Sequence, residues 1–402
     1  MLMAASFCDV NLRSGPPKLH DFLSDQNGKT SSFCRSHAHA QKLCSYSRQH
    51  KFLKKLDTKH VEVKQRFKLH RASFAKNAHS SELAKEDDIS MATLIWRAIK
   101  LPIYSVALVP LTIGSTSAYL QSSTFPATRY FVLLVSSILV ITWLNLSNDV
   151  YDFDTGADKN KKESVVNLIG SRTGTLVAAY LFLVLGSMGL IRVSLEAGHL
   201  RAMLLLACAI ICGYIYQCPP FRLSYHGLGE PLCFAAFGPF ATTAFYWLMG
   251  NNSSASYLPL TGTVLCASLL VGFTTSLILF CSHFHQVEED IKVGKISPLV
   301  RLGTEKGSSV VKVAVVALYS FLLTSGLSRD LPFTCIILCL LTLPMGNRVV
   351  SFVEENHEDK RSIFMAKYYC VRLHALFGAS LAAGLVIAKF GYKRYVPRLI
   401  LS

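Results

Sequence analysis

The sequence contains two clusters of acidic and amide side chains, each followed closely by basic residues. The first lies in NDVYDFDTGADKNKK, at residues 148–162, and the second in QVEEDIKVGK, at residues 286–295. Asp149 and Asp152 are three residues apart, so their carboxylates would share one face if a helix continued through them. Carboxylate oxygens are hard ligands of the kind that Mg²⁺ prefers. The acidic and amide residues of the two clusters are Asn148, Asp149, Asp152, Asp154, Asp158, Gln286, Glu288, Glu289 and Asp290.

Two acidic clusters that met would repel each other unless a positive charge lay between them. Mg²⁺ usually keeps some of its waters and binds through a few carboxylates together with the phosphates of a substrate. Because basic residues accompany the acids, the pattern indicates a diphosphate site in which Lys295, Arg301 and Arg222 neutralise the remaining charge. Two alternatives stay open, namely that the clusters are solvated loop charges or that His283 and His285 bind zinc.

The elements that carry these clusters are predicted to cross a membrane. The chain of 402 residues is 51% hydrophobic and 16% charged, whereas soluble proteins average about 25% charged residues. Nine apolar runs are long enough to cross about 30 Å of hydrocarbon, which predicts an all-α, polytopic membrane protein. The expected helices are residues 101–120, 128–147, 173–193, 200–217, 230–249, 260–282, 308–327, 331–346 and 372–390, and the eighth is short and ends at Pro344.

The order of the crossings places the two acidic clusters on the same side of the membrane. Nine crossings leave the loops at 148–172, 218–229, 283–307 and 347–371 on one side, which we name side A. These loops contain 13 Lys and Arg residues, whereas the connections on the opposite side B are short and nearly uncharged. By the positive-inside rule, side A faces the compartment from which the protein was inserted, here the stroma or the matrix.

The N-terminal segment differs in composition from the rest of the chain. Residues 1–85 contain 16 Lys and Arg against 6 Asp and Glu, and show no apolar periodicity that could form a core. The basic, Ser-rich and acid-poor composition predicts an organellar transit peptide, and the excess of Lys over Arg favours the chloroplast. A disordered tail that binds anionic lipid is the alternative. We expect a transit peptide and disordered basic tail over residues 1–85 and a transmembrane domain over residues 86–402.

From about residue 95 to 390 the chain resembles the UbiA superfamily of intramembrane prenyltransferases. The resemblance depends on the NDxxD motif at residues 148–152 and on the segments NDVYDFDTGADKNKKESVVNLIGSRTG and FCSHFHQVEEDIKVGKISPLVRLG. These segments are most similar to the plant and cyanobacterial branch, which transfers a phytyl group to 1,4-dihydroxy-2-naphthoate in phylloquinone biosynthesis. The resemblance implies a bundle of nine transmembrane helices.

The same resemblance implies the reaction and its place. The donor would be phytyl diphosphate, the cofactor Mg²⁺, and the acceptor 1,4-dihydroxy-2-naphthoate, whose attacked ring carbon loses its carboxylate as CO₂. The protein would contact membrane lipid and no nucleic acid. It would lie in a chloroplast membrane, either the thylakoid or the inner envelope, with the active-site loops facing the stroma.

Residue roles are carried over from the family by position. The metal ligands so implied are Asn148, Asp149, Asp152, Asp158, Glu289 and Asp290, and the catalytic residues among them are Asp149, Asp152 and Asp290. The diphosphate-binding residues are Lys162, Arg172, Lys295 and Arg301, and the substrate-binding residues are Arg222, Tyr225 and Gln286. The chain departs from the family pattern at Gly156, where a further Asp is common, and at Gln286, which replaces the first Asp of the second motif. The choice between Asp154 and Asp158, and between Glu288 and Glu289, as ligands therefore stays open.

The implied chemistry leaves an allylic cation in a dry cavity, where aromatic faces could stabilise it. An aromatic residue in a membrane helix is more often a packing residue, so none is assigned to the site. The aromatic candidates are Tyr151, Phe153, Tyr214, Tyr216, Phe237, Phe240, Phe245 and Tyr246.

Several other functions are compatible with a chain of this kind. Prenylation of homogentisate or 4-hydroxybenzoate, and chlorophyll synthesis, are alternative reactions. Only the resemblance of the motifs separates them from the favoured reaction. A transporter would place ionisable residues near the middle of the bilayer, whereas the acids here lie at predicted helix ends. A membrane structural protein would not need paired acidic loops.

Overall fold

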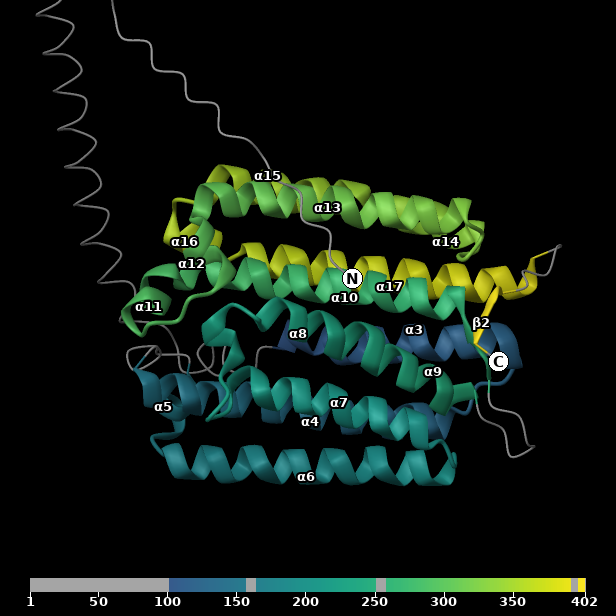
Figure 1. Ribbon diagram of the computed structural model, residues 1–402, viewed down its shortest axis with the longest axis horizontal. Helices are drawn as coiled ribbons and strands as arrows, with labels where there is room; N and C mark the ends of the chain where they lie inside the picture. The colour runs from purple at the N-terminus through teal and green to yellow at the C-terminus, as the bar shows by residue number, and fades with distance from the viewer. Residues whose placement is uncertain (1–100, 157–163, 251–257, 392–396, 402) are drawn as a thin grey trace, which may run out of the picture. The chain divides into compact units, whose positions relative to one another are not determined.

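The structure is a computed structural model that describes residues 101–156, 164–250, 258–391 and 397–401. Within these ranges the chain is almost entirely helical, and the long helices run side by side (Figure 1). The predicted boundary at residue 85 lies outside the described residues. The elements of the first half are η1 (Leu101–Tyr104), α3 (Ser105–Ser122), α4 (Ala127–Thr155), α5 (Val165–Ile169), α6 (Arg172–Glu196), α7 (Leu200–Gln217), η2 (Leu223–His226), α8 (Gly229–Ala235), the π-helical η3 (Ala236–Thr242) and α9 (Thr243–Gly250).

The second half of the chain adds a similar set of helices and two very short strands. These elements are β1 (Leu260–Thr261), α10 (Gly262–His283), η4 (Phe284–Gln286), α11 (Val287–Lys292), α12 (Pro298–Leu302), α13 (Thr304–Leu327), α14 (Phe333–Leu340), α15 (Leu343–Asn356), α16 (Lys360–Ile363), α17 (Ala366–Phe390) and β2 (Leu399–Leu401). The all-α prediction is therefore confirmed, and each predicted apolar run is helical over most of its length.

Fewer helices than predicted are long and apolar enough to count as membrane spans. Among the described residues, seven helices meet this criterion, or eight if the bent pair α14 and α15 forms one span. The predicted count of nine is thus not confirmed. The difference lies in α3, which occupies the first predicted run but carries a polar second half, TIGSTSAYLQS.

The predicted end of the eighth helix at Pro344 is wrong. α14 ends at Leu340, and α15 begins at Leu343 after a bend of 43°, so that Pro344 lies in the first turn of α15. Proline has no backbone N–H, and it is tolerated in a first helical turn because that N–H would lack an intrahelical partner anyway. Much of the segment expected as a loop from residue 347 is therefore helix.

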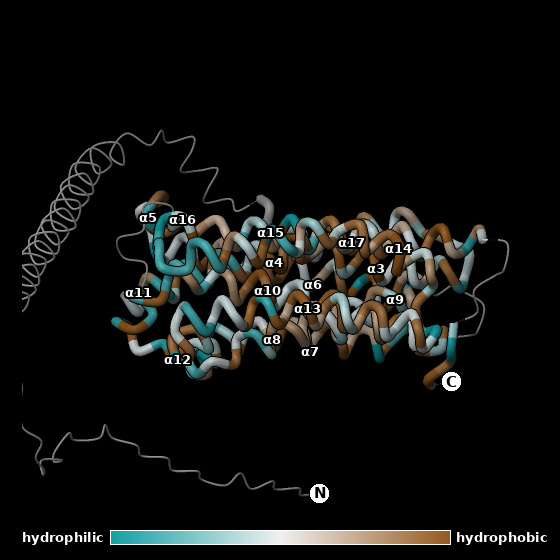
Figure 2. The backbone as a smooth tube through the Cα atoms, turned by 90° about the horizontal axis from the view of Figure 1, so that it is seen from above, coloured by the Kyte–Doolittle hydropathy of each residue, from teal (hydrophilic) through white to brown (hydrophobic). Residues whose placement is uncertain are grey.

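The loops of side A meet at one end of the bundle, as the crossing order predicts. Figure 1 places α5, α11, α12 and α16 at this end, and Figure 2 shows hydrophilic residues gathered there. Lys360 of α16 lies 3.0 Å from Glu288 and 2.5 Å from Glu289 of α11. At the other end β2 pairs antiparallel with β1, and the N–H of Gly262 donates to the carbonyl of Arg398. The C-terminal strand therefore lies on side B.

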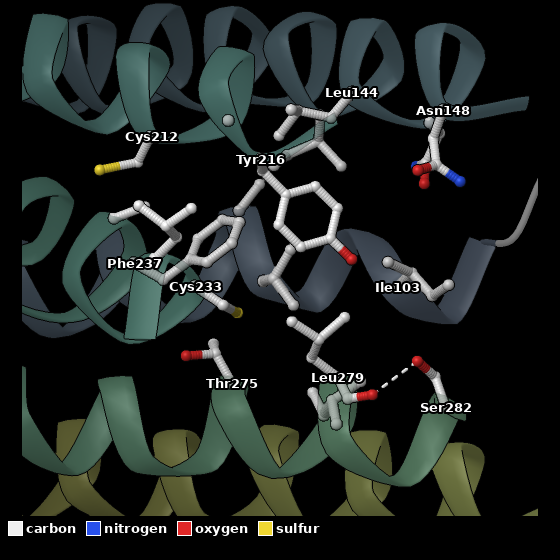
Figure 3. A pocket seen from close by; sticks show the side chains of 18 of the residues that line it. Ile103, Leu144, Asn148, Cys212, Tyr216, Cys233, Phe237, Thr275, Leu279 and Ser282 are labelled. Carbon is white, nitrogen blue, oxygen red and sulfur yellow. Dashed lines mark hydrogen bonds between the residues drawn. The ribbon is translucent and has the colours of Figure 1, made fainter. Parts of the chain in front are cut away.

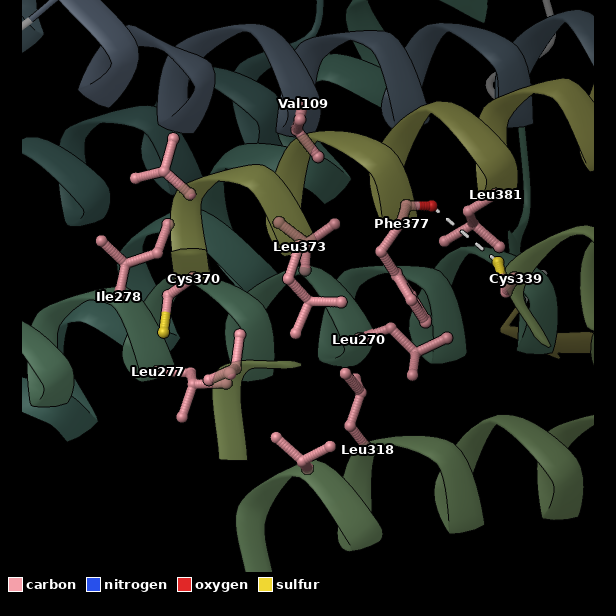
Figure 4. Packing of buried hydrophobic residues seen from close by; sticks show 14 of the residues in the cluster. Val109, Leu270, Leu277, Ile278, Leu318, Cys339, Cys370, Leu373, Phe377 and Leu381 are labelled. Carbon is pink, nitrogen blue, oxygen red and sulfur yellow. Dashed lines mark hydrogen bonds between the residues drawn. The ribbon is translucent and has the colours of Figure 1, made fainter. Parts of the chain in front are cut away.

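Two hydrophobic clusters fill the bundle, and α3 contributes to both. The first joins α3 to α10, α13, α14, α15 and α17, and Figure 4 shows part of it, in which Leu270 and Leu277 of α10 face Leu373 and Phe377 of α17. The second joins α3 to α4, α6, α7 and α9.

Gly114 allows α3 to approach α9 closely. A Cβ at this position would lie 2.7 Å from the carbonyl oxygen of Thr242 and 2.8 Å from the Cβ of Phe245. Small residues at such positions let helix backbones pack where the membrane itself supplies no hydrophobic drive. The α3–α9 contact thus depends on the missing side chain.

Candidate active site

A cavity of about 340 Å³ lies between the two hydrophobic clusters. Val140 and Leu206 from the second cluster line it, as do Ile278 and Val371 from the first. Figure 3 shows the ring of Tyr216 entering this cavity from α7 between α4 and α10. The charged, histidine and amide residues that line the cavity are Asn145, Asn148, Asp152, Gln217, His283, His285, Gln286, Lys295 and Lys367. Most of them come from the side A ends of the helices or from side A loops.

The last turns of α4 bring part of the first acidic cluster to the cavity. Asn148 and Asp152 both line it, and the amide Nδ2 of Asn148 donates to Oδ2 of Asp152 at 2.7 Å. The two residues are four apart and therefore lie on one face of the helix. α4 continues past them and ends where Gly156 adopts the left-handed conformation at φ 89°.

Asp149 lies between these residues in the chain but is not among those that line the cavity. Its side chain is buried, at 1% exposure, and its Oδ2 accepts the backbone N–H of Val165 at 3.2 Å. Val165 is the first residue of α5, so Asp149 links the end of α4 to the start of the next helix. The structure thus brings Asp152, but not Asp149, to the cavity wall.

The second cluster contributes a buried ion pair. Nζ of Lys295 lies 3.2 Å from Oδ1 of Asp290, and the backbone N–H of Lys295 also donates to the carbonyl of Asp290 at 2.8 Å. Oδ2 of Asp290 is buried and has no hydrogen-bond partner among the residues that the structure describes. Lys295 lines the cavity, which places a positive charge beside the carboxylates.

The charge of Lys295 is maintained by its neighbours. Burial disfavours the charged ammonium, but the carboxylates of Asp290 and Asp152 outweigh this effect and raise the pKa of Lys295 above its ordinary value. Asp152 of the first cluster and Lys295 beside Asp290 of the second line the same cavity, so the two acidic clusters meet there, as the crossing order predicts.

The segment around η2 connects the two clusters. The hydroxyl of Tyr225 donates to Oγ1 of Thr155 at the end of α4, at 3.0 Å, and its carbonyl accepts the N–H of Ile296 at 2.8 Å. The guanidinium carbon of Arg222 and Nζ of Lys295 each lie 5.9 Å from the centre of the Tyr225 ring. Burial raises the pKa of the Tyr225 hydroxyl. Neither Arg222 nor Tyr225 is among the residues that line the cavity.

The remaining predicted residues have other partners in the structure. Arg172 forms two hydrogen bonds to Asp154, at 2.6 and 3.0 Å, and Arg301 donates to the carbonyl of His226 at 2.8 Å. Glu289 pairs with Lys360, and Gln286 lines the cavity. Asp158 and Lys162 lie outside the described residues.

The structure also brings to the cavity residues to which no motif assigned a role at the diphosphate site. His283 lines the cavity and pairs with Glu230, the acidic residue in the first turn of α8. A single acid at the start of an apolar run was the available signal for Glu230. Lys367 of α17 lines the cavity too, with its Nζ 3.8 Å from the centre of the Phe364 ring. Tyr216, Phe237 and Phe245 are the predicted aromatic candidates that reach the cavity.

The donor set fits a metal that shares its coordination with a substrate. In the part of the chain that the structure describes, no group of three or more His, Cys, Asp or Glu side chains could hold a metal ion. Mg²⁺ does not need such a cage, because it uses one or two carboxylates together with phosphate oxygens and water. The unpartnered Oδ2 of Asp290 and the carboxylate of Asp152 are oxygens of that kind.

Residues 107–371 match the UbiA prenyltransferase family. The chain belongs to this family. It is 68% identical over 310 residues to 2-carboxy-1,4-naphthoquinone phytyltransferase, chloroplastic, of Arabidopsis thaliana, which covers 77% of this chain and 81% of the relative. It is 40% identical over 305 residues to 2-carboxy-1,4-naphthoquinone phytyltransferase of Synechocystis, which covers 76% of this chain and 97% of the relative.

Solved UbiA structures share the fold. A UbiA homolog from Archaeoglobus fulgidus bound to DMAPP and Mg²⁺ has a TM-score of 0.50 and 14% identity, over 71% of this chain and 98% of that chain. The fold and the family predicted from the NDxxD motif are therefore confirmed.

Proposed function

We propose that this UbiA-family enzyme transfers a phytyl group from phytyl diphosphate to 1,4-dihydroxy-2-naphthoate, with loss of CO₂, as a step of phylloquinone biosynthesis. The observation that carries the proposal is the 68% identity to a naphthoquinone phytyltransferase, joined to a cavity that is polar at side A and apolar within. A diphosphate with a long hydrocarbon tail matches both halves of this cavity.

The diphosphate belongs at the side A end of the cavity. Asn148, Asp152 and Asp290 offer the oxygens for Mg²⁺, which is supported by the Mg²⁺ in the Archaeoglobus UbiA structure. When bound, Mg²⁺ would offset the negative charge that develops on the leaving diphosphate. Lys295 adds a fixed positive charge from the protein itself, and it is already oriented by Asp290 before the substrate arrives.

The other predicted site residues remain part of the proposal in supporting positions. Asp149 and Tyr225 hold the end of α4 against α5 and η2, and thereby keep Asp152 in place. Gln286 contributes an amide at the cavity wall. We also assign diphosphate binding to Lys162, Arg172, Arg301 and Arg222, and metal binding to Asp158 and Glu289. The bound substrate would draw these side chains to the site.

The apolar part of the cavity protects the allylic cation that forms when the carbon–oxygen bond breaks. Tyr216, Phe237 and Phe245 line it, and their ring faces attract a cation. Water is a competing nucleophile, so the apolar walls also protect the cation from hydrolysis. The bound phytyl tail stays in an apolar environment, because burial away from water is favourable by about 0.8 kcal/mol for each methylene group.

The acceptor reacts in its reduced, dihydroxy form. The names of the relatives give the naphthoquinone, but a quinone ring is electron-poor, whereas the two hydroxyl groups of the dihydroxy ring enrich it. The ring carbon that carries the carboxylate forms the new bond to the phytyl carbon, and the carbon–oxygen bond electrons leave with diphosphate. The carboxylate then departs as CO₂ and returns its electron pair to the ring, so no external oxidant or reductant is needed.

The enzyme is assigned to a chloroplast membrane, in keeping with the chloroplastic relative and the apolar helices. We propose that residues 1–85 direct it there and that side A, with its excess of basic residues, faces the stroma.

The proposal is tested with membranes that contain the full chain, incubated with phytyl diphosphate and either 1,4-dihydroxy-2-naphthoate or homogentisate. We expect a phytylated naphthoquinol and one CO₂ for each product, both abolished by EDTA and restored by Mg²⁺. Product from homogentisate alone would replace the acceptor and keep the family chemistry. No product from either acceptor, in membranes that contain the inserted protein, would overturn the proposal.

A matched pair of variants tests the assignment of the carboxylates. Asp152→Asn should lower kcat about 10²-fold or more, because it removes a carboxylate that would hold Mg²⁺ against the leaving diphosphate. Glu354→Gln removes an exposed carboxylate of α15 that pairs with Lys312 at 3.1 Å and is not among the residues lining the cavity, and it should leave the rate unchanged. Equal rates for both variants would contradict the role of Asp152.

A further inference from the structure

His283, which is buried at the cavity wall, pairs with the partly exposed Glu230, and the proposed diphosphate site does not use this pair. His283 is the last residue of α10, it is 2% exposed and it lines the cavity. Its Nδ1 lies 3.1 Å from Oε1 of Glu230. Oε2 of Glu230 is buried and has no hydrogen-bond partner among the residues described. An isolated buried acid and imidazole are costly unless they pair, so their contact is specific.

Two contacts fix α8 on α10 and hold this pair in place. The hydroxyl of Ser276 donates to the backbone carbonyl of Glu230 at 3.1 Å, while the side chain of Glu230 meets His283. Ser276 and His283 are seven residues apart, which is about two turns on one face of α10. The imidazole therefore has little freedom to rotate away from the carboxylate.

The carboxylate occupies Nδ1 of His283, so Nε2 is the ring nitrogen left for a ligand in the cavity. An ionised carboxylate only accepts hydrogen bonds, so the proton of a neutral His283 lies on Nδ1 and Nε2 is left as a proton acceptor. A carboxylate at Nδ1 further stabilises the imidazolium that forms when Nε2 takes a proton. The pair thus has the arrangement of a general base and the residue that orients it.

Neighbouring polar groups in the described wall are engaged differently. The hydroxyl of Ser282 donates to the carbonyl of Leu279 at 2.6 Å, as Figure 3 shows, and the hydroxyl of Thr275 donates to the carbonyl of Val271 at 3.0 Å. Both hydroxyls use their protons on their own helix. His285 packs its ring edge-on against Phe364, with 5.0 Å between ring centres.

The pair lies near the place where the carbon–oxygen bond breaks. Tyr216 lines the cavity together with Asp152 and His283, and its ring lies against Gly229, the residue before Glu230, where an added Cβ would be 2.9 Å from the ring. The aromatic ring that enters the cavity in Figure 3 is therefore within reach of both the diphosphate carboxylates and the histidine pair. A flat acceptor that approaches the allylic carbon would have His283 beside it.

We propose that His283 is the general base that takes the proton from the C1 hydroxyl of the acceptor, and that Glu230 is its positioning residue. This inference rests on the proposed function. The C1 hydroxyl is adjacent to the attacked carbon C2, and its deprotonated oxygen donates electrons directly to C2. As the C2–phytyl bond forms, C1 becomes a ketone. Loss of CO₂ returns the electron pair to the ring and to the C1 oxygen, which recovers the proton from His283, so protons and electrons balance without a co-reactant.

The test compares the natural acceptor with its C1 methyl ether, 1-methoxy-4-hydroxy-2-naphthoate, which has no proton to give. For the wild-type chain we expect the methyl ether to react about 10²-fold more slowly. His283→Ala should lower kcat on the natural acceptor by a similar factor and leave the KM for phytyl diphosphate unchanged. On the methyl ether this variant should be no slower than wild type, because the step that His283 assists is absent.

Two further variants separate a base from a merely structural residue. Glu230→Gln keeps a hydrogen-bond acceptor for Nδ1 but loses the charge, so it should lower kcat less than Glu230→Ala does, again without changing the KM for phytyl diphosphate. His285→Ala should retain the full difference between the two acceptors.

The outcomes distinguish this inference from the proposed function. A loss of equal size on both acceptors for His283→Ala would mean structural damage and would overturn the base assignment. Wild-type rates for His283→Ala would overturn it as well, while naphthoate turnover by the wild type leaves the proposed function standing. Failure of the wild type on both acceptors would remove the proposed function and this inference with it.

Discussion

Asp149 and Asp152 illustrate how far single residues can be assigned from a motif. The NDxxD spacing correctly located the acids at a helix end, and Asn148 and Asp152 reach the cavity together. Spacing alone could not reveal that Asp149 faces the start of α5, because α5 lies beyond a connection whose path the sequence does not specify. His283 was noticed only as a possible zinc ligand, since nothing in the sequence places Glu230 beside it.

Lys295 supports a prediction about pH at this scale. Its folded-state pKa is raised above the unfolded value, so the stability that the Asp290 pair contributes is complete below the ordinary lysine pKa of about 10.4 and is lost only as the pH rises through the folded pKa. We therefore expect the KM for phytyl diphosphate in the wild type to stay constant as the pH rises from about 7 to about 9.5.

Substitutions of Lys295 provide the measurement. Lys295→Met should raise this KM about tenfold or more throughout the range, since a charged hydrogen bond contributes about 1.5–3 kcal/mol, and Lys295→Arg should recover part of it. Lys312→Met, which removes an exposed lysine paired with Glu354, is the control. A wild-type KM that rises toward the variant's value by pH 9.5 would show that Lys295 loses its proton earlier than we expect.

At the scale of elements, the apolar runs predicted the helices well, but they did not predict where the helices break and connect. Pro344 predicts the end of a helix, whereas it lies in the first turn of α15, because proline is compatible with either side of a helix boundary and only packing decides. The segment η2 could be named as a border of the site from family resemblance. Its role as a link from Thr155 to Ile296 depends on hydrogen bonds between distant residues, which local patterns do not encode.

The start of α7 gives a prediction about acid sensitivity. Nδ1 of His199 accepts the N–H of Ala202 at 3.2 Å, and its ring stacks on Trp247 with 4.9 Å between centres. Burial lowers the pKa of His199, so the folded chain binds this proton less readily than the unfolded chain. The resulting stability is present above the unfolded pKa of about 6.5 and is lost as the pH falls through this region.

Thermal unfolding in detergent should reveal the effect. The Tm of the wild type is expected to drop between pH 7.5 and pH 5.5, and the drop should be smaller in His199→Asn, which keeps a cap acceptor that does not titrate. His226→Asn, at an exposed histidine, should behave like the wild type. The assignment fails if His199→Asn loses as much Tm as the wild type.

At the scale of the whole helical domain, the crossing order was the most productive inference. It placed four loops on side A from hydropathy alone, and the contacts of Lys360 with α11 and of Tyr225 with Thr155 and Ile296 confirm that those loops meet. The number of spans was less secure, because α3 is half polar and is accommodated by contacts with both hydrophobic clusters rather than by its own apolarity.

That double contact makes α3 the element on which the cavity depends. Gly114→Ala would push a methyl group to within 2.7 Å of a backbone oxygen of Thr242, and overpacking of this kind typically costs about 1–3 kcal/mol. We expect a lower Tm and a higher KM for the acceptor, measured on detergent-purified protein. Leu108→Ala, at a 44% exposed position of the same helix, should change both much less. An unchanged Tm for Gly114→Ala would contradict the close approach of α3 and α9.

The cavity is polar at one end and apolar within, so the proposed reaction would move its acceptor from the aqueous side toward the membrane interior. The acceptor enters as a water-soluble anion, and the same event that attaches the hydrocarbon chain discards the carboxylate. Hydrophilicity is lost at the moment lipophilicity is gained, so the product partitions into the bilayer and does not return to the aqueous side. The proposed reaction therefore moves the acceptor from water into lipid in one direction. Loss of CO₂ and partitioning of the quinol into the bilayer both oppose the reverse reaction.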